Sequence, residues 1–221
     1  MFFNFNPHNK LEMNNTNKEG WLHKKSEIFW AEIPPCEHLI QIYENDEVFI
    51  NSLVSFATAG IAAGEVTIII ATGGHIQVLE ERMMKKGIDI TAAKKSDLYI
   101  PLDAGETIKT FMVNSWPDEE KFNKLIIDLI ARGNGRRIRA FGEMVALMWA
   151  QGFNGATIHL EHLWGKFCDS GVFCLFCAYP KSGFTQDIKT SINDVCQKHS
   201  TVIAGWEDDK DAEVFYKTGT F

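Results

Sequence analysis

Residues 66–71 read Val-Thr-Ile-Ile-Ile-Ala, and residues 38–43 read His-Leu-Ile-Gln-Ile-Tyr. The first stretch is a continuous, β-branched apolar run, which is typical of a strand buried on both faces, and the second alternates as a strand does. A helical pattern follows each of them. Asn45 or Asp46 offers an N-cap to the first helix, which Gly60 and Gly64 are expected to end. This strand-helix-strand-helix beginning predicts a parallel sheet.

The rest of the chain continues the alternation. Strands are predicted at 98–102, 137–141, 172–178 and 201–204, and helices at 76–86, 106–112, 118–132, 144–150, 156–168 and 187–198. Strands separated by helices imply right-handed crossovers, so we predict the α/β class: a mostly parallel sheet covered by helices on both faces.

Three segments are predicted along the chain. Residues 1–30 are rich in Asn, Lys and Glu, and we expect a flexible N-terminal arm with one short helix near 26–30. Residues 31–205 form the domain. Residues 206–221 form a C-terminal extension whose charged run at 207–211 is either solvated or packed on the domain.

Composition narrows the class of protein. The 221 residues suit one domain, and 45% hydrophobic with 23% charged residues is a globular composition. The net charge of -7 disfavours direct contact with nucleic acid, because phosphate binding needs a basic surface. The longest apolar run is far shorter than the roughly 20 residues that cross a bilayer, and no signal-peptide pattern is visible. Five cysteines form an odd set, which indicates reduced thiols and a cytoplasmic protein.

In parallel sheets, ligands bind outside the carboxyl ends of the strands. The residues that follow the predicted strands are 44–46, 72–75, 103, 142–144 and 179–181. A phosphate-binding loop would place glycines and a lysine after the first strand, but this chain has Glu44-Asn45-Asp46-Glu47 there. Three carboxylates repel phosphates, which disfavours a nucleoside triphosphate site.

Glu143 follows a predicted strand that carries Arg137 and Arg139. Its carboxylate either points into the crevice with an arginine as partner, or forms a structural ion pair or helix cap, and both interpretations stay open. Trp149 and Trp164 lie on predicted helices, where an indole serves either the core or the wall of a ligand site.

The sequence predicts no metal site, cofactor or catalytic group. In a strand, Cys174 and Cys177 point to opposite faces, so they are expected to be buried free thiols and not a disulfide or a metal pair. Glu161, with His159 and His162 beside it, matches no zinc motif. No Gly-x-Ser-x-Gly nucleophile motif occurs.

Five blocks of the sequence resemble one family. They are His38–Glu44, Arg139–Ala150, Leu160–Trp164, Phe176–Pro180 (Phe-Cys-Ala-Tyr-Pro) and Asp194–Ser200. In this order they resemble the MEDS domain, the methanogen/methylotroph, DcmR-type sensory domain, over about residues 36 to 204. The first block departs from the family pattern, because it has Ile40 and Ile42 where the family usually carries a Cys or other small residue and a Phe.

The resemblance implies a RecA/KaiC-like three-layer architecture without a phosphate loop. It also implies sensing of small organic molecules, particularly hydrocarbon derivatives, and a signal passed to a regulator such as a histidine kinase or a transcription factor. The characteristic positions of the family correspond here to His38, Tyr43, Gly142, Glu143, Met144, Tyr179 and Pro180.

Our hypothesis is a stand-alone sensory domain that binds a small organic ligand at the carboxyl ends of the strands. The candidate ligand-binding residues are His38, Tyr43, Glu44, Asp46, Glu143, Met144, Trp149, Trp164 and Tyr179. We expect the output to be a separate regulatory protein or a change of homo-oligomeric state. Two alternatives stay open: a ligand-free interaction module, and a divergent nucleotide-binding protein or enzyme that uses Glu143 as a base.

Overall fold

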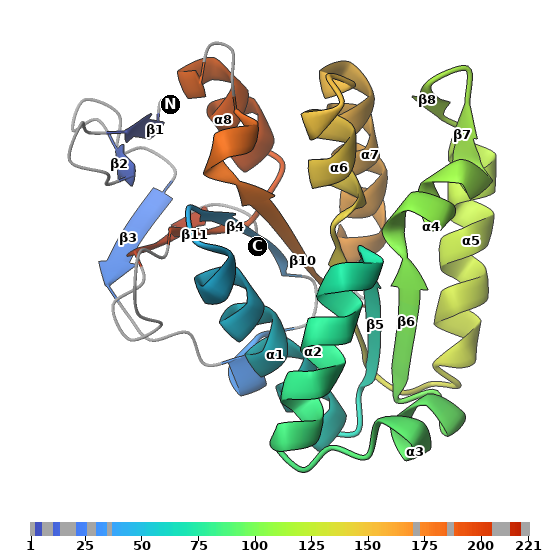
Figure 1. The fold of residues 1–221 in the computed structure, drawn as a ribbon. Helices are drawn as coiled ribbons and strands as arrows, with labels where there is room; N and C mark the ends of the chain where they lie inside the picture. The colour runs from blue at the N-terminus through green and yellow to red at the C-terminus, as the bar shows by residue number, and fades with distance from the viewer. Residues whose placement is uncertain are drawn as a thin grey trace.

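The computed structural model describes residues 3–5, 11–13, 21–25, 30–34, 37–169, 173–184, 188–204 and 213–217. Its centre is an eight-stranded sheet in the order β3-β12-β11-β4-β10-β9-β5-β6 (Figure 1). These strands are β3 (Trp21–Lys25), β12 (Glu213–Lys217), β11 (Thr201–Ala204), β4 (His38–Tyr43), β10 (Phe173–Pro180), β9 (Ile138–Gly142), β5 (Val66–Ala71) and β6 (Tyr99–Asp103). The six strands from β11 to β6 are parallel, and β12 runs antiparallel to β11 and β3.

Helices cover both faces of the sheet, which confirms the predicted α/β class (Figure 1). One face, here called the α1 face, is covered by η1 (Trp30–Glu32), α1 (Asp46–Ala62), α2 (Gly73–Lys85) and α3 (Ile90–Lys95). The other, the α7 face, is covered by α4 (Ala104–Phe111), α5 (Glu119–Arg132), α6 (Met144–Ala150), α7 (Asn154–Asp169) and α8 (Ile188–Cys196). Short elements complete the fold: η2 (Lys181–Gly183), the pair β1 (Phe3–Phe5) and β2 (Leu11–Met13), and the pair β7 (Met112–Val113) and β8 (Trp116–Pro117).

The central strands are buried along their whole length, because helices pack on both sides of them. Every residue of β4 and of β5 is buried. Successive side chains of a strand point to opposite faces, so each strand contributes to both cores. In β4, Ile40 and Ile42 join the core of the α7 face, whereas Leu39 and Tyr43 join the core of the α1 face.

Capping residues explain where the first helices begin. The side chain of Asn45 accepts a hydrogen bond from Glu47 N (2.8 Å) at the start of α1, as one of the two predicted caps. Thr72 caps α2 in the same way, and Gly73 and Gly74 are in the first turn of this helix. Both caps satisfy backbone N–H groups that have no partner within the helix.

The prediction that Gly60 ends α1 is wrong, because the helix continues to Ala62. A Cβ at Gly60 would lie 2.5 Å from both Arg139 Cδ and Thr67 Oγ1, so glycine serves close packing of the helix on the sheet. Gly64, at φ +73°, follows the helix end instead. Such a conformation favours glycine.

The sheet also includes residues that we placed outside the domain. Trp21–Lys25 and Glu213–Lys217 form β3 and β12, the two outermost strands on one side. Phe215 and Trp21 are buried in the core of the α7 face. Strand pairing and burial therefore extend the sheet past residue 205. The predicted helix near 26–30 lies largely outside the described residues, apart from Trp30, and so does the charged run at 207–211.

Candidate functional site

Glu143, directly after β9, is a buried carboxylate at the carboxyl edge of the sheet. Its Oε2 accepts a hydrogen bond from the backbone N–H of Thr72 (2.8 Å), and its Oε1 accepts one from His75 Nδ1 (2.9 Å). Thr72 and His75 lie at the start of α2, which follows β5. Because β5 and β9 are adjacent and parallel, their carboxyl ends bring these three residues together. The hydrogen bond to Glu143 raises the pKa of His75 above its usual 6.5.

Of the two interpretations left open for Glu143, the structure does not support the one with an arginine as partner. Arg139 Nε donates to Glu65 Oε2 (2.5 Å), and Arg137 Nη1 lies 3.2 Å from Glu65 Oε1. Arg139 and Glu143 are four residues apart, which along a strand is about 13 Å. The two arginines therefore meet Glu65 at the amino end of the strand, far from the carboxyl edge.

Tyr43 lies on the α1 face close to Glu143. Its ring stacks on Phe49 at a centroid distance of 4.7 Å, and Phe49 meets the edge of His75 at 5.2 Å. Burial raises the pKa of Tyr43, and the nearby Glu143 and Asp46 carboxylates raise it further, so the phenol is neutral. Tyr43 is thus a packed, uncharged residue beside the Glu143–His75 pair.

Glu44 and Asp46 lie at the surface of this edge, where both are exposed. Glu44 forms an ion pair with Lys181 of η2, and Asp46 is in the first turn of α1. Acidic residues at a helix N-terminus are favourable electrostatically, so Asp46 has a structural role in α1.

The remaining predicted site residues are on the other side of the sheet. Met144, Trp149, Trp164 and Tyr179 are all buried in the core of the α7 face, and His38 of β4 points to the same side. The sheet therefore separates these residues from Tyr43 and from the Glu143–His75 pair. The predicted set does not form a single crevice, because the side chains of one strand alternate between its faces.

A cavity of about 490 Å³ lies on the α7 face, where β10 ends. It is lined by Trp149, Ala150, Gly152, Asn154, Pro180, Ser182 and Gly183. These residues come from α6 and the turn that follows it, from the start of α7, and from η2 with the end of β10. The cavity thus lies at the carboxyl edge of the sheet and includes Trp149, a predicted site residue, and Pro180 of the Phe-Cys-Ala-Tyr-Pro block.

The indole of Trp149 connects this cavity to the interior. Its ring packs against Phe184 at a centroid distance of 5.4 Å and against Tyr179 at 6.5 Å. Tyr179 in turn donates a hydrogen bond from its hydroxyl to Glu161 Oε1 (2.5 Å). Two contacts in series therefore lead from the cavity wall to a buried carboxylate.

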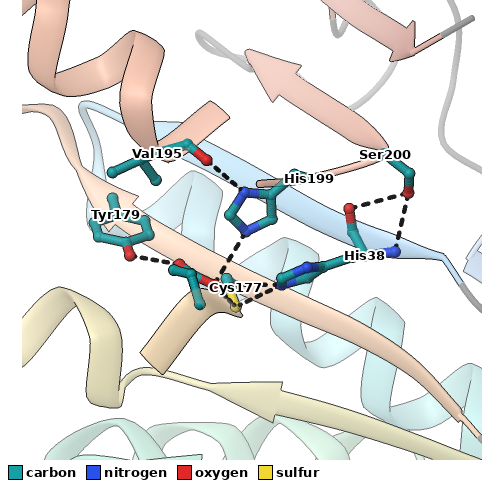
Figure 2. A network of polar contacts seen from close by, with 7 residues as sticks. His38, Cys177, Tyr179, Val195, His199 and Ser200 are labelled. Carbon is teal, nitrogen blue, oxygen red and sulfur yellow. Dashed lines mark hydrogen bonds and ion pairs between the residues drawn. The ribbon is translucent and has the colours of Figure 1, made fainter. Parts of the chain in front are cut away.

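Glu161 belongs to a polar cluster buried between the sheet and α7. Figure 2 labels the other three members, His38, Cys177 and His199. The cluster is defined as His38, Glu161, Cys177 and His199. Each residue offers one atom that could ligate a metal, and these four atoms lie within 4.8 Å of one another. Its members come from β4, α7, β10 and the turn between α8 and β11. All four are buried, and ligand atoms gathered in this way can hold a metal ion.

Burial determines the protonation of the cluster. It lowers the pKa of His38 and of His199 to about 3, so both imidazoles are neutral near pH 7. The same burial raises the pKa of Glu161 and of the Cys177 thiol. Without a cation the cluster therefore favours its uncharged forms.

Sequence reasoning named His38 as a candidate ligand-binding residue but did not bring it together with Glu161, Cys177 or His199. We considered Glu161 only with its neighbours His159 and His162, but His162 is exposed and His159 stacks on Trp116 at 5.3 Å. One signal was available: Glu161 lies among Leu160, Leu163 and Trp164 on the apolar side of α7, where a charged residue needs a partner. Nothing in the residue spacing linked it to His38 or His199.

The prediction for the cysteines is confirmed for the two on β10. Cys174 belongs to the core of the α1 face and Cys177 to the core of the α7 face, and both are buried free thiols. Cys36 lies outside the described residues.

Comparisons with known proteins agree with this fold. The family model of the MEDS domain, the methanogen/methylotroph, DcmR sensory domain, matches residues 37–200. A solved structure of a protein from Pyrococcus horikoshii OT3 is similar at a TM-score of 0.52 with 7% sequence identity, and the match covers 82% of this chain and 87% of that chain. At this identity the likeness shows the fold alone. No curated protein matches the chain.

The structure is thus a mostly parallel α/β fold with a cavity and a buried polar cluster on one face of its sheet. The chain belongs to the MEDS family of sensory domains, because the family model covers well over half of its length. Within the described residues, no helix combines the length and apolar character needed to cross a membrane.

Proposed function

We propose that this sensory domain binds a small, partly apolar organic molecule in the cavity beside Trp149 and signals through a separate regulatory protein. The observation that carries the proposal is the position of this cavity. It lies at the carboxyl edge of a parallel sheet, in a chain of a sensory family, and an indole forms part of its wall.

The size and lining of the cavity suit such a ligand. About 490 Å³ is within the range of small-molecule sites, which runs from roughly 300 to 1,000 Å³. Trp149, Ala150 and Pro180 provide apolar surface, and Asn154 and Ser182 provide polar groups. A short hydrocarbon chain with one hydroxyl, carbonyl or halogen group matches this combination.

Tyr179 connects the cavity wall to Glu161, which supports a route for the signal. A ligand that displaces the Trp149 ring acts on Tyr179, whose hydroxyl is bonded to Glu161. A ligand shifts an equilibrium only by its differential affinity for two states, so the two arrangements of Trp149 must bind it unequally. The partner is a regulator such as a histidine kinase or a transcription factor, which binds the surface formed by α6 and η2.

The proposal is tested by filling the cavity from an exposed position. Ala150→Phe places a ring in the cavity, whereas Gln151→Phe adds the same ring at the next exposed residue, which does not line it. Saturation-transfer NMR with short-chain alcohols, aldehydes and haloalkanes measures binding to each variant. We expect binding to the wild-type protein and to Gln151→Phe, and at least a tenfold loss in Ala150→Phe. No binding to the wild type, or equal binding to the two variants, would contradict the proposal.

A further inference from the structure

We propose that the buried cluster of His38, Glu161, Cys177 and His199 is a binding site for one divalent transition-metal ion of the zinc class. The site lies on the α7 face. Tyr179 lies between it and the cavity, because it contacts both Glu161 and Trp149. The site does not depend on the proposed organic ligand, since it rests on the geometry of four side chains alone.

The spacing of the donor atoms matches a tetrahedral metal site. Zinc binds nitrogen and oxygen at about 2.0–2.1 Å and sulfur at about 2.3 Å, so neighbouring ligand atoms of a tetrahedron are about 3.3–3.6 Å apart. Glu161 Oε2 lies 3.4 Å from His38 Nε2 and 3.5 Å from His199 Nε2. Cys177 Sγ lies 3.6 Å from His38 Nε2 and 3.8 Å from Glu161 Oε2. Four of the six edges of the tetrahedron therefore have about the expected length.

The hydrogen bonds around the cluster leave its ligand atoms available. His199 Nδ1 lies 2.9 Å from the carbonyl oxygen of Val195, which can only accept, so Nδ1 carries the proton and Nε2 has a free lone pair (Figure 2). Among the described residues, His199 Nε2 has no hydrogen-bond partner. A backbone carbonyl that holds the second ring nitrogen is the usual outer partner of a metal-bound histidine.

The two carboxylate oxygens of Glu161 also have different partners. Oε1 accepts the hydroxyl proton of Tyr179, and Oε2 faces both imidazoles and the Cys177 thiol. One thiol proton cannot satisfy both His38 Nε2 and Glu161 Oε2. A lone pair of His199 also faces a carboxylate oxygen, which is unfavourable unless a proton or a cation lies between them.

Charge balance favours a divalent cation. The ion-pair partners that the structure gives Glu161 are two imidazole rings, and no lysine or arginine is among them. A thiolate and a carboxylate together carry two negative charges, which equals the charge of the ion in magnitude. A metal ion displaces the proton of a coordinating thiol directly. Thiolate with imidazole is a ligand set that zinc prefers, and four protein ligands leave a closed, structural type of site.

The test uses Co²⁺ as a probe, because tetrahedral Co²⁺ gives visible absorption bands and a bound thiolate adds a near-ultraviolet charge-transfer band. The full chain is stripped of metal with a chelator and titrated with Co²⁺, and Zn²⁺ is then added as a competitor. Cys177→Ser removes the proposed sulfur ligand. Cys174→Ser is the matched control, since Cys174 is a buried thiol of the same strand on the opposite face.

We expect the wild-type protein and Cys174→Ser to bind one Co²⁺ per chain with both kinds of band, and Zn²⁺ to displace it. Cys177→Ser should lose the charge-transfer band and at least tenfold in affinity. If Cys177→Ser does not fold, as judged by circular dichroism, His199→Gln replaces it and should lose the same affinity. The proposal is overturned if the wild type takes up no Co²⁺ with a thiolate band, or if the folded ligand variant binds as the wild type does. Metal uptake is measured without any organic molecule, so its result is separate from that of the cavity experiment.

Discussion

Glu143 uses both of its carboxylate oxygens to join two neighbouring strand ends. One oxygen accepts the Thr72 backbone N–H and the other accepts His75 Nδ1, at 2.8 and 2.9 Å. The structure thus gives this residue a partner from α2 in place of an arginine from its own strand. Because it is hydrogen-bonded to a backbone amide and to an imidazole, Glu143 stabilises the carboxyl edge of the sheet on the α1 face.

The pairing of His75 with Glu143 predicts a pH dependence. The folded-state pKa of His75 is raised above 6.5 by this hydrogen bond, so the protonated ring stabilises the fold. This stabilisation is complete below about pH 6.5 and declines as the pH rises through the folded pKa. NMR titration of His75 should show the raised pKa, and Glu143→Gln should lower it.

The control for this titration is Glu47→Gln. Glu47 is an exposed carboxylate of the same edge, but its hydrogen bonds are with Arg82 and not with His75. It should leave the His75 titration unchanged. An equal shift in both variants would mean that general surface charge, and not the contact with Glu143, sets the pKa of His75.

At the scale of the elements, helix α1 packs so closely on the sheet that one position has no room for a side chain. Gly60 faces Arg139 of β9 and Thr67 of β5. The Arg139 guanidinium fills the space under the helix, where it donates to the Phe56 carbonyl oxygen (3.0 Å) and lies 4.9 Å from the centre of the Phe56 ring. A buried arginine between helix and strand therefore sets the distance between these two elements.

Two glycine substitutions should have opposite effects. Gly60→Ala places a Cβ 2.5 Å from Arg139 Cδ, so we expect it to destabilise the protein by roughly 1–3 kcal/mol although alanine favours helices. A methyl group at Gly165 in α7 would point into open space, and Gly165→Ala should stabilise by roughly 0.5–1 kcal/mol. Urea unfolding measures both changes. If Gly60→Ala is also stabilising, the helix can move away from the sheet at low cost.

For the whole molecule, the sheet divides the domain into two sides with different chemistry. The α1 face holds the Glu143–His75 pair and the Arg139–Glu65 ion pair. The α7 face holds the cavity and the buried cluster, which Tyr179 connects. Binding of a small molecule and binding of a metal ion are therefore both proposed for one side of the sheet, with α6 and α7 as the helices that cover it.

Two substitutions in β12 test whether this strand unfolds together with the rest of the domain. Phe215 is buried in the core of the α7 face, and its neighbour Tyr216 is 38% exposed. We expect Phe215→Ala to lower the free energy of unfolding by roughly 3–5 kcal/mol. Tyr216→Ala should change it by about 0.5 kcal/mol. Thermal and urea unfolding give both values, and no loss in Phe215→Ala would mean that residues 213–217 do not unfold together with the domain.

Most of the parallel sheet could be predicted from the sequence, because the elements of an α/β fold carry local patterns. The strands at 38–43, 66–71 and 201–204 were predicted at their observed bounds, the first from its alternation and the second from its continuous apolar run. β3 and β12 were missed, because the pairing of β12 with β11 and of β3 with β12 is decided by tertiary contacts and not by a local period. The short helix α3 and the β7–β8 pair were missed for a similar reason, since each is too short to show a period.

The sequence by itself determined that this chain is a member of the MEDS family with a mostly parallel sheet between two helical layers. Alternation and capping residues act over a few positions, so a single sequence reveals them. The tertiary structure alone decided which polar residues meet. His38 and Glu161 are separated by more than a hundred residues, and only the pairing of β4 with β10 and the packing of α7 on them bring the two side chains into contact. Burial then gives this contact its chemistry, because it removes the water that would otherwise satisfy each polar group.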